Sequence, residues 1–97
     1  MVVSLSSILS EVSKEIGVSK DDILSKGLRA YLRTELGKVE TELFSIYHKY
    51  GIKSIHDLEH SIEKGEVSES DVLDDLTKVD YLESRRDKLK NLLVRAG

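Results

Sequence analysis

Residues Ser19–Tyr50 read SKDDILSKGLRAYLRTELGKVETELFSIYHKY, an amphipathic stretch that no proline interrupts. Its main apolar residues recur at spacings of 4, 3, 4, 3 and 4, the heptad pattern of a helix that buries a narrow seam against another helix. At about 1.5 Å per residue this helix is a rod on the order of 45 Å long, too long for a small globule to enclose. The residues of the stripe are Leu32, Leu36, Val39, Leu43, Ile46 and Tyr50.

Glycines and capping serines divide the chain into four predicted helices. Each glycine follows an apolar periodic segment and supplies a left-handed stop. Each serine stands three residues before an aspartate, the pattern of an N-terminal capping box. The glycines are Gly17, Gly51 and Gly65, and the serines are Ser19, Ser54 and Ser68. The predicted helices therefore span about residues 5–16, 19–50, 54–64 and 69–95.

The last predicted helix carries an apolar stripe that matches the one on the long helix. The stripe consists of Val72, Leu76, Val79, Leu82, Leu89 and Leu93. A short helix between the two long ones lets the chain reverse its direction. We expect an all-α fold, an elongated coiled-coil-like antiparallel helical hairpin with short flanking helices. One domain, residues 1–97, would then contain a helix-turn-helix-like module over residues 1–33 and the hairpin over residues 34–97.

Arg86 stands at a heptad position of the last helix, in an otherwise apolar seam. One interpretation is that its head reaches the edge of the seam or pairs with a facing glutamate, such as Glu35, Glu40 or Glu42. The other is that it fixes the register of the hairpin or reaches a carboxylate of a partner. The residues predicted to form the packing or partner seam are Leu32, Leu36, Val39, Leu43, Ile46, Leu82, Arg86, Leu89 and Leu93.

Apolar residues outside these stripes are more than two helices can hide. They are Ile23, Leu24, Leu28, Tyr31, Phe44, Tyr47, Tyr81 and Leu92. We expect a homodimer or a partner chain to cover them. Gly27 and Gly37, inside the long helix, each cost about 1 kcal/mol relative to alanine. Each is a candidate for close approach of another helix, and tolerated sequence drift is the alternative.

Composition excludes several classes of protein. The 97 residues include no cysteine, so disulfide and thiolate chemistry are excluded. The sequence has no run of 18 apolar residues and no basic leader before its first apolar segment, so we expect a cytoplasmic protein without a membrane span. The net charge of −3 is unevenly placed, since Asp57–Asp75 carries eight acids and one base while residues 85–95 carry five bases and one acid. This pattern argues against tight non-specific binding of nucleic acid.

His56 and His60 are the residues that invite a metal-site interpretation. They are four apart on a predicted helix, and the segment HDLEH at residues 56–60 matches the H-x-x-E-H pattern of inverted zinc peptidases. Those enzymes need a third ligand and a cleft in a much larger fold. We therefore interpret both histidines as surface residues and predict no catalytic residue, no metal site and no cofactor. The chain is predicted not to be an enzyme.

The N-terminal module resembles the helix-turn-helix part of ribbon-helix-helix repressors and antitoxins. The resemblance lies in EIGVSK at residues 15–20, followed by Ile23-Leu24 and by LRAYL at residues 28–32. It implies that the turn sets the N-terminus of the second helix against a DNA phosphate, and that residues 1–6 form a short strand in the groove. It places Gly17, Val18, Ser19 and Lys20 in that anchoring role. The residues predicted to bind DNA are Ser4, Ser6, Ser19, Lys20 and Lys26. The strand lacks the side chains that read base edges, and two acids follow Lys20.

The rest of the chain is similar to small archaeal proteins that are presumed antitoxins. The similar segments are YLR at residues 31–33, KYG at 49–51, GEV at 65–67 and DYLE at 80–83. The resemblance implies a toxin-like partner, and the acidic stretch suits a basic one. We predict an antitoxin-like or regulatory protein-interaction module that homodimerises and masks a partner protein. A DNA-binding repressor that uses the N-terminal module is the alternative.

Overall fold

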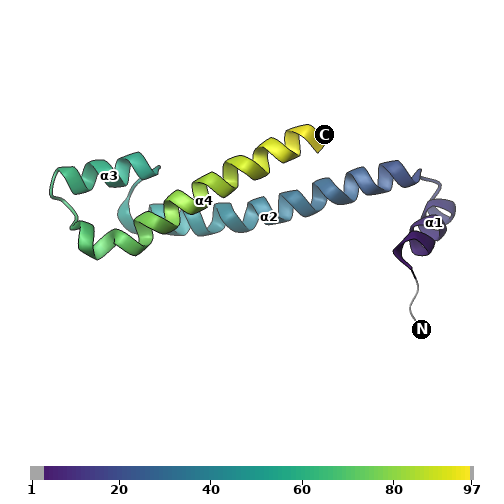
Figure 1. Ribbon diagram of the computed structural model, residues 1–97, viewed down its shortest axis with the longest axis horizontal. Coiled ribbons are helices and arrows are strands. Elements are labelled where there is room, and N and C mark those ends of the chain that lie inside the picture. The colour runs from purple at the N-terminus through teal and green to yellow at the C-terminus, as the bar shows by residue number, and fades with distance from the viewer. Residues whose placement is uncertain (1–3, 97) are drawn as a thin grey trace.

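A computed structural model describes residues 4–96 and confirms the all-α, elongated fold (Figure 1). Its helices are α1 (Leu5–Ile16), α2 (Lys20–Tyr50), α3 (Ile55–Glu63) and α4 (Glu69–Ala96). The molecule measures 62 × 30 × 17 Å and has a Cα radius of gyration of 20.1 Å. A compact domain of this length would have a radius of gyration of about 12–13 Å. The chain is therefore a rod.

The helix ends follow the local chemistry of the sequence. Ser19 Oγ accepts from the backbone N–H of Asp22 at 3.1 Å, and Ser54 Oγ accepts from Asp57 at 3.3 Å. Gly17, Gly51 and Gly65 have φ angles of 75°, 64° and 75°, which favour glycine. The start of α4 differs, because Ser68 Oγ lies 2.9 Å from Ser70 Oγ while the Ser68 backbone carbonyl accepts from the N–H of Asp71.

Helices α2 and α4 run antiparallel, side by side, and form the hairpin (Figure 1). Two ion pairs across the hairpin show its direction. Lys49 pairs with Asp75, and Glu42, earlier in α2, pairs with Lys78, later in α4. Apolar side chains from both helices fill the seam between them. The buried cluster consists of Leu32, Val39, Leu43, Ile46, Val79, Leu82 and Leu89.

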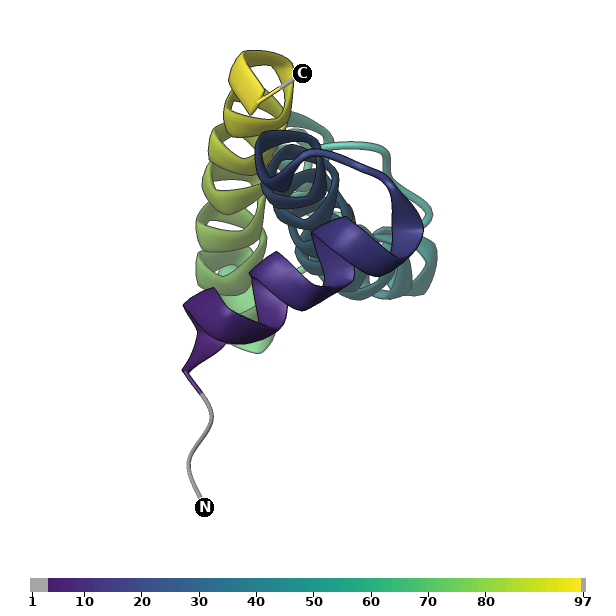
Figure 2. The ribbon, with the colours of Figure 1, turned by 90° about the vertical axis from the view of Figure 1, so that its right-hand side faces the viewer.

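The two short helices lie at opposite ends of this rod (Figure 1). Helix α3 packs on the start of α4, where Leu58 is 0% and Val72 is 2% exposed. Helix α1 crosses the far end of α2 (Figure 2) and has no buried residue. Because α2 continues beyond the C-terminal end of α4 (Figure 1), α1 is its main neighbour there. We call α1 and the first turns of α2, residues 4–31, the overhang.

The predicted N-terminal strand is wrong for the residues that the structure describes. Ser4 is the N-cap of α1, and Leu5 and Ser6 are its first helical residues. Ser4 Oγ accepts from the N–H of Ser7 at 3.2 Å, which favours a helix start. The apolar spacing of Leu5 with Ile8 and Leu9 extends this helix, whereas a strand would need a paired neighbour. Residues 1–3 lie outside the described part, and residues 4–96 contain no strand.

Candidate functional site

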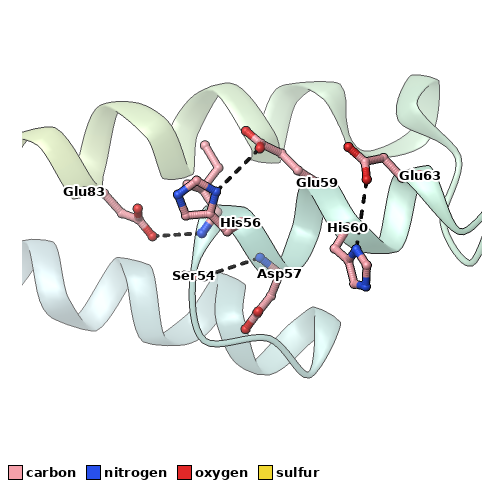
Figure 3. Close-up of polar contacts among 8 residues, drawn as sticks. Ser54, His56, Asp57, Glu59, His60, Glu63 and Glu83 are labelled. Atoms are coloured by element: carbon pink, nitrogen blue, oxygen red, sulfur yellow. Dashed lines mark hydrogen bonds and ion pairs between the residues drawn. The ribbon is translucent and has the colours of Figure 1, made fainter.

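Glu83 joins three helices at the end of the rod that α3 closes. Its Oε2 accepts hydrogen bonds from the hydroxyl of Tyr47 on α2 and from the backbone N–H of Ile55, the latter at 3.1 Å. Figure 3 shows the Glu83 carboxylate reaching from α4 towards the start of α3. Burial and the Glu83 carboxylate together raise the pKa of Tyr47 to about 12. The contact fixes the first turn of α3 against the hairpin.

Asp75 makes a second polar contact between α2 and α4. Its Oδ2 accepts from the hydroxyl of Tyr50 at 2.5 Å and from Nζ of Lys49 at 2.8 Å. The hydrogen bond from Lys49, followed by that from Tyr50, holds the pKa of Asp75 below its usual value. Asp75 is one of the eight acids from Asp57 to Asp75. Its carboxylate joins α4 to α2 and thereby stabilises the hairpin.

The seven other acids of that stretch are exposed, and we call them the acidic end. They lie on α3, on the loop after it and on the first two turns of α4 (Figure 1). They are Asp57, Glu59, Glu63, Glu66, Glu69, Asp71 and Asp74. Because Glu83 and Asp75 hold α3 and α4 in place, these carboxylates form a fixed negative surface, which attracts a positively charged partner over distance.

Both histidines of α3 are exposed and each lies near its own glutamate (Figure 3). Nδ1 of His56 is 3.8 Å from Glu59 Oε2, and Nδ1 of His60 is 4.0 Å from Glu63 Oε2. Their side chains are 89% and 64% exposed. Within residues 4–96 no three histidine, cysteine or acidic side chains gather closely enough to hold a metal ion. The geometry is that of surface side chains on one helix.

Arg86 lies half-buried at the edge of the hairpin, between the two helices. Its Nε donates to Oδ1 of Asp87, the next residue, at 3.1 Å. The contacts found for it therefore differ from the facing glutamates named above. A small hollow of about 220 Å³ next to it is lined by Leu43, Phe44 and Tyr47 among others. Phe44 itself is 70% exposed and stacks on His48 with ring centroids 6.1 Å apart.

The residues predicted to contact DNA occupy the overhang. Ser4 and Ser19 use their hydroxyls to cap α1 and α2, and Ser6 lies on α1. Lys20 and Lys26 are exposed on α2, beside Asp21 and Asp22. The turn between the helices is stabilised by Ser13, whose hydroxyl donates to the carbonyl of Val18 at 2.7 Å. Lys20 is the first residue of α2, next to its cap Ser19, as the DNA-binding interpretation expects. Ser4 and Ser6 lie at the start of helix α1 and not on the expected strand.

The predicted seam residues lie together along the hairpin. Leu32, Val39, Leu43, Ile46, Leu82 and Leu89 belong to the buried cluster, and Leu36 and Leu93 pack on it while partly exposed. The hairpin therefore covers most of the seam with its own two helices. Six of the eight apolar residues off the seam stay open, since Leu24, Leu28, Tyr31, Phe44, Tyr81 and Leu92 are each 43–70% exposed. Ile23 and Tyr47 are partly buried, and Tyr47 packs on the buried cluster.

An apolar groove runs along the overhang between α1 and α2. Its volume is about 670 Å³, and its walls are carried by Leu5, Ile8, Leu9 and Val12 of α1 and by Ile23, Leu24, Gly27 and Leu28 of α2. Sequence reasoning named Leu24 and Leu28 as unburied but did not place them opposite α1. The helical spacing of Leu5, Ile8 and Val12 was the available signal.

Sequence reasoning also missed the two polar contacts. Two short segments, KYG at residues 49–51 and DYLE at residues 80–83, supply Lys49, Tyr50 and Glu83, and the other contact residues, Tyr47, Ile55 and Asp75, lie outside them. The similarity to small archaeal proteins points to these segments, whereas the contacts depend on how α2 and α4 are aligned. A pattern along one helix does not give that alignment.

The helices of residues 4–96 include none that is long and apolar enough to cross a membrane. The chain is similar to the uncharacterized protein MJ0235 of Methanocaldococcus jannaschii, with 29% identity over 73 residues, which cover 75% of this chain and 89% of that protein. No solved structure matches the chain. The sequence profile of the uncharacterized protein MJ0235 family matches residues 1–95, and the chain therefore belongs to that family.

Proposed function

We propose that this chain is a non-enzymatic protein-interaction module, antitoxin-like or regulatory, whose acidic end masks a basic surface of a partner protein. The observation that carries the proposal is the group of seven exposed carboxylates on α3, its loop and the start of α4. They stand on helices that the contacts of Glu83 and Asp75 hold in place. A rigid charged surface loses little conformational entropy when it binds a partner.

The charges of this surface favour a basic partner over an acidic or neutral one. Lys64 is the one base among the eight acids from Asp57 to Asp75, so the stretch has a net charge of −7. Complementary charge of this size accelerates association and rejects partners of like charge. A toxin-like protein with a basic functional surface is the partner class that this chemistry suits best.

The interior of the rod supports a role without catalysis. Every buried side chain among residues 4–96 is apolar, and the buried cluster fills the narrow seam of the hairpin. Catalytic acids and bases are commonly held in partly buried sites that shift their pKa values. The groups with clearly shifted pKa values are Tyr47, Lys49, Tyr50, Asp75 and Arg86. The first four join α2 to α4, and Arg86 bonds to its neighbour Asp87.

Purification of the tagged chain from its native host, with the product of the neighbouring gene identified, gives the partner to test. The association rate of that partner is then measured with the variant Glu59→Gln/Glu63→Gln/Glu66→Gln. We expect the rate to fall roughly tenfold or more at low salt, because steering depends on these charges. The matched control is Glu11→Gln/Glu15→Gln/Asp21→Asn, which removes three acids from the overhang. Equal rates for both variants contradict the proposal.

A DNA-binding repressor is the second candidate function. It is favoured by the turn of Gly17 and by the capped N-terminus of α2, where Lys20 is exposed. Phosphate contacts make affinity fall steeply with salt. Titration of duplex DNA at two salt concentrations tests this function, with Lys20→Gln/Lys26→Gln compared with Lys88→Gln/Lys90→Gln on α4. If the affinity for DNA changes neither with salt concentration nor with Lys20→Gln/Lys26→Gln, this candidate function is excluded.

Homodimerisation is part of the proposal, because apolar side chains on the overhang and on both long helices remain exposed in one chain. A cytoplasmic location belongs to the same proposal. The partner-binding surface and the surface that joins two copies need not coincide. The two ends of the rod differ enough in charge and apolar character to separate these roles.

A further inference from the structure

The rod has a larger accessible surface than a compact monomer of the same mass. Its accessible surface is 7318 Å², whereas a compact monomer of 10.9 kDa would expose roughly 5,600 Å². The excess, roughly 1,700 Å², exceeds the area of about 800 Å² that each partner buries in a standard interface. There is thus enough surface for a stable association with another chain.

The overhang is the part of the rod that most needs cover. Helix α1 has 12 residues and none of them is buried, with Leu5 84%, Ile8 41% and Ile16 69% exposed. A helix of this length is marginal in water unless packing supports it. Leu24 and Leu28, on the facing wall of the apolar groove, are 56% and 53% exposed. The groove is therefore open to another apolar surface.

Gly27 is a glycine inside α2 at the same place. It lies within α2 on the wall of the groove, where glycine weakens a helix relative to alanine. Among residues 4–96, no atom apart from its local helix lies within 4 Å of where a Cβ would stand. Packing within the chain does not require glycine here. The open space leaves room for another chain to approach the backbone of α2 closely.

Charge decides which end of the rod can meet a second copy. Residues 4–31 carry four bases and four acids, so two overhangs meet without net repulsion. Helix α1 carries Glu11 and Glu15 against Lys14, and the first turns of α2 carry Lys20, Lys26 and Arg29 against Asp21 and Asp22, so their net charges are −1 and +1. A two-fold contact can place α1 of one copy against α2 of the other, with opposite charges facing. The acidic ends, in contrast, repel each other.

From these observations we infer that two copies of this chain associate through their overhangs. The apolar grooves close against each other, and Gly27 allows the α2 helices to approach closely. Helix α2 projects beyond the end of α4 (Figure 1). Each copy therefore leaves room beside its overhang for the projecting part of the other copy. The surface is used on both copies in the same way, so the assembly closes as a dimer.

The consequence is a longer rod with an acidic end at each extremity. This consequence rests on the proposed function, since it makes the dimer a bivalent module that can hold two basic partners. Two linked sites raise the overall affinity for a partner that is itself dimeric, without new contacts. The association of the two copies stands apart from partner binding and is measured without any partner.

Sedimentation equilibrium of the full chain tests the inference. We expect the wild type to have twice the chain mass of 10.9 kDa and Leu28→Gln to raise the dimer dissociation constant roughly tenfold or more, because each buried leucine contributes on both sides of the symmetry axis. The matched control is Leu73→Gln on α4, where the leucine is 52% exposed against 53% for Leu28. Wild type that stays monomeric, or equal effects of both substitutions, overturns the inference.

A second measurement does not depend on a substituted groove. The chain contains no cysteine, so a single introduced cysteine carries a spin label at one site alone. Ser25→Cys, exposed on the overhang, is expected to give a short distance between the two labels of a dimer, and Lys64→Cys, near the acidic end, a long one. The reverse order of the two distances overturns the inference.

The failures of the two proposals are distinguishable. A dimer joined at the overhang that captures no basic partner leaves this inference intact and contradicts the proposed function. A monomer that still binds its partner through the acidic end contradicts this inference alone.

Discussion

Glu83, in the middle of α4, contacts the C-terminal part of α2 and the start of α3. Its Oε2 receives the hydroxyl of Tyr47 and the N–H of Ile55, so one carboxylate satisfies a phenol and the first turn of α3. The free N–H groups at a helix start need such acceptors. Asp75 acts in the same way for Tyr50 and Lys49. At the residue scale, polar contacts therefore hold the acidic end to the hairpin.

Tyr47→Phe is expected to lower the free energy of unfolding by about 1.5 kcal/mol, because it removes a hydrogen bond to a charged acceptor. The measurement is urea unfolding followed by circular dichroism. Tyr81→Phe is the control, since the Tyr81 side chain is 61% exposed. An equal effect of the two substitutions would mean that the bond to Glu83 contributes nothing.

The burial of Tyr47, together with its bond to Glu83, also affects the alkaline titration of the phenols. The pKa of Tyr47 is about 12 in the folded chain against 10.0 for a free phenol. Between these values the unfolded chain binds fewer protons than the folded one, so stability falls as pH rises through this window. We expect this part of the alkaline loss of stability to be absent from Tyr47→Phe, while Tyr81→Phe retains it.

Asp75 affects the dependence of stability on pH in the acid range. Its pKa in the folded chain lies below the value of 3.8 for a free carboxyl, chiefly because of the hydrogen bond from Lys49. The unfolded chain therefore binds more protons between the two values, and stability rises with pH there. The contribution is complete above the unfolded pKa and disappears as pH falls through the folded one. Asp75→Asn is expected to flatten this acid limb in thermal melts, with Asp74→Asn as its exposed neighbouring control.

At the scale of the element, the hairpin depends on one buried face of α2. Leu43 is 2% exposed and its neighbour Phe44 is 70% exposed. We expect Leu43→Asp to unfold the chain, because a buried charge without a partner is among the most destabilising changes. Phe44→Asp places the same carboxylate one residue further on, in solvent, and is expected to keep native helicity. Thermal melts compare the two, and a folded Leu43→Asp would show that the seam lies elsewhere.

The elements that could be predicted are those whose signals lie within one helix. Gly17 and Gly51 end helices because φ is positive there, and Ser19 and Ser54 begin helices by capping them. The stripe from Leu32 to Ile46 gives the buried face of α2 for the same reason, since its spacing matches the helical repeat.

The features that were not predicted depend on contacts between helices. Glu83 accepts a hydrogen bond from Tyr47 across the hairpin, and this pairing follows from the alignment of α2 with α4. Arg86 instead bonds to Asp87, the next residue of its own helix. The alternation of apolar and polar residues around Ser4 suggested a strand, but the cap at Ser4 starts α1 instead. Six residues carry too little periodic signal to outweigh a cap followed by helical spacing.

At the scale of the whole molecule, the rod separates an apolar end from an acidic end. The overhang, residues 4–31, has no net charge and an open apolar groove, whereas Asp57–Asp75 at the far end has a net charge of −7. A 62 Å rod keeps the two apart. Association of copies and capture of a basic partner then need not compete for the same surface.

Small-angle scattering distinguishes the ways in which two such rods can join. Two copies side by side over their full length keep the longest dimension near the 62 Å of one chain. Two copies that share the overhang are expected to have a longest dimension well above it, and a correspondingly larger radius of gyration. Leu28→Gln, measured below its dissociation constant, should return the radius of gyration to about 20.1 Å. A value near 12–13 Å for that variant would mean that the single chain folds back into a globule, and neither the rod nor its two separate ends would survive that result.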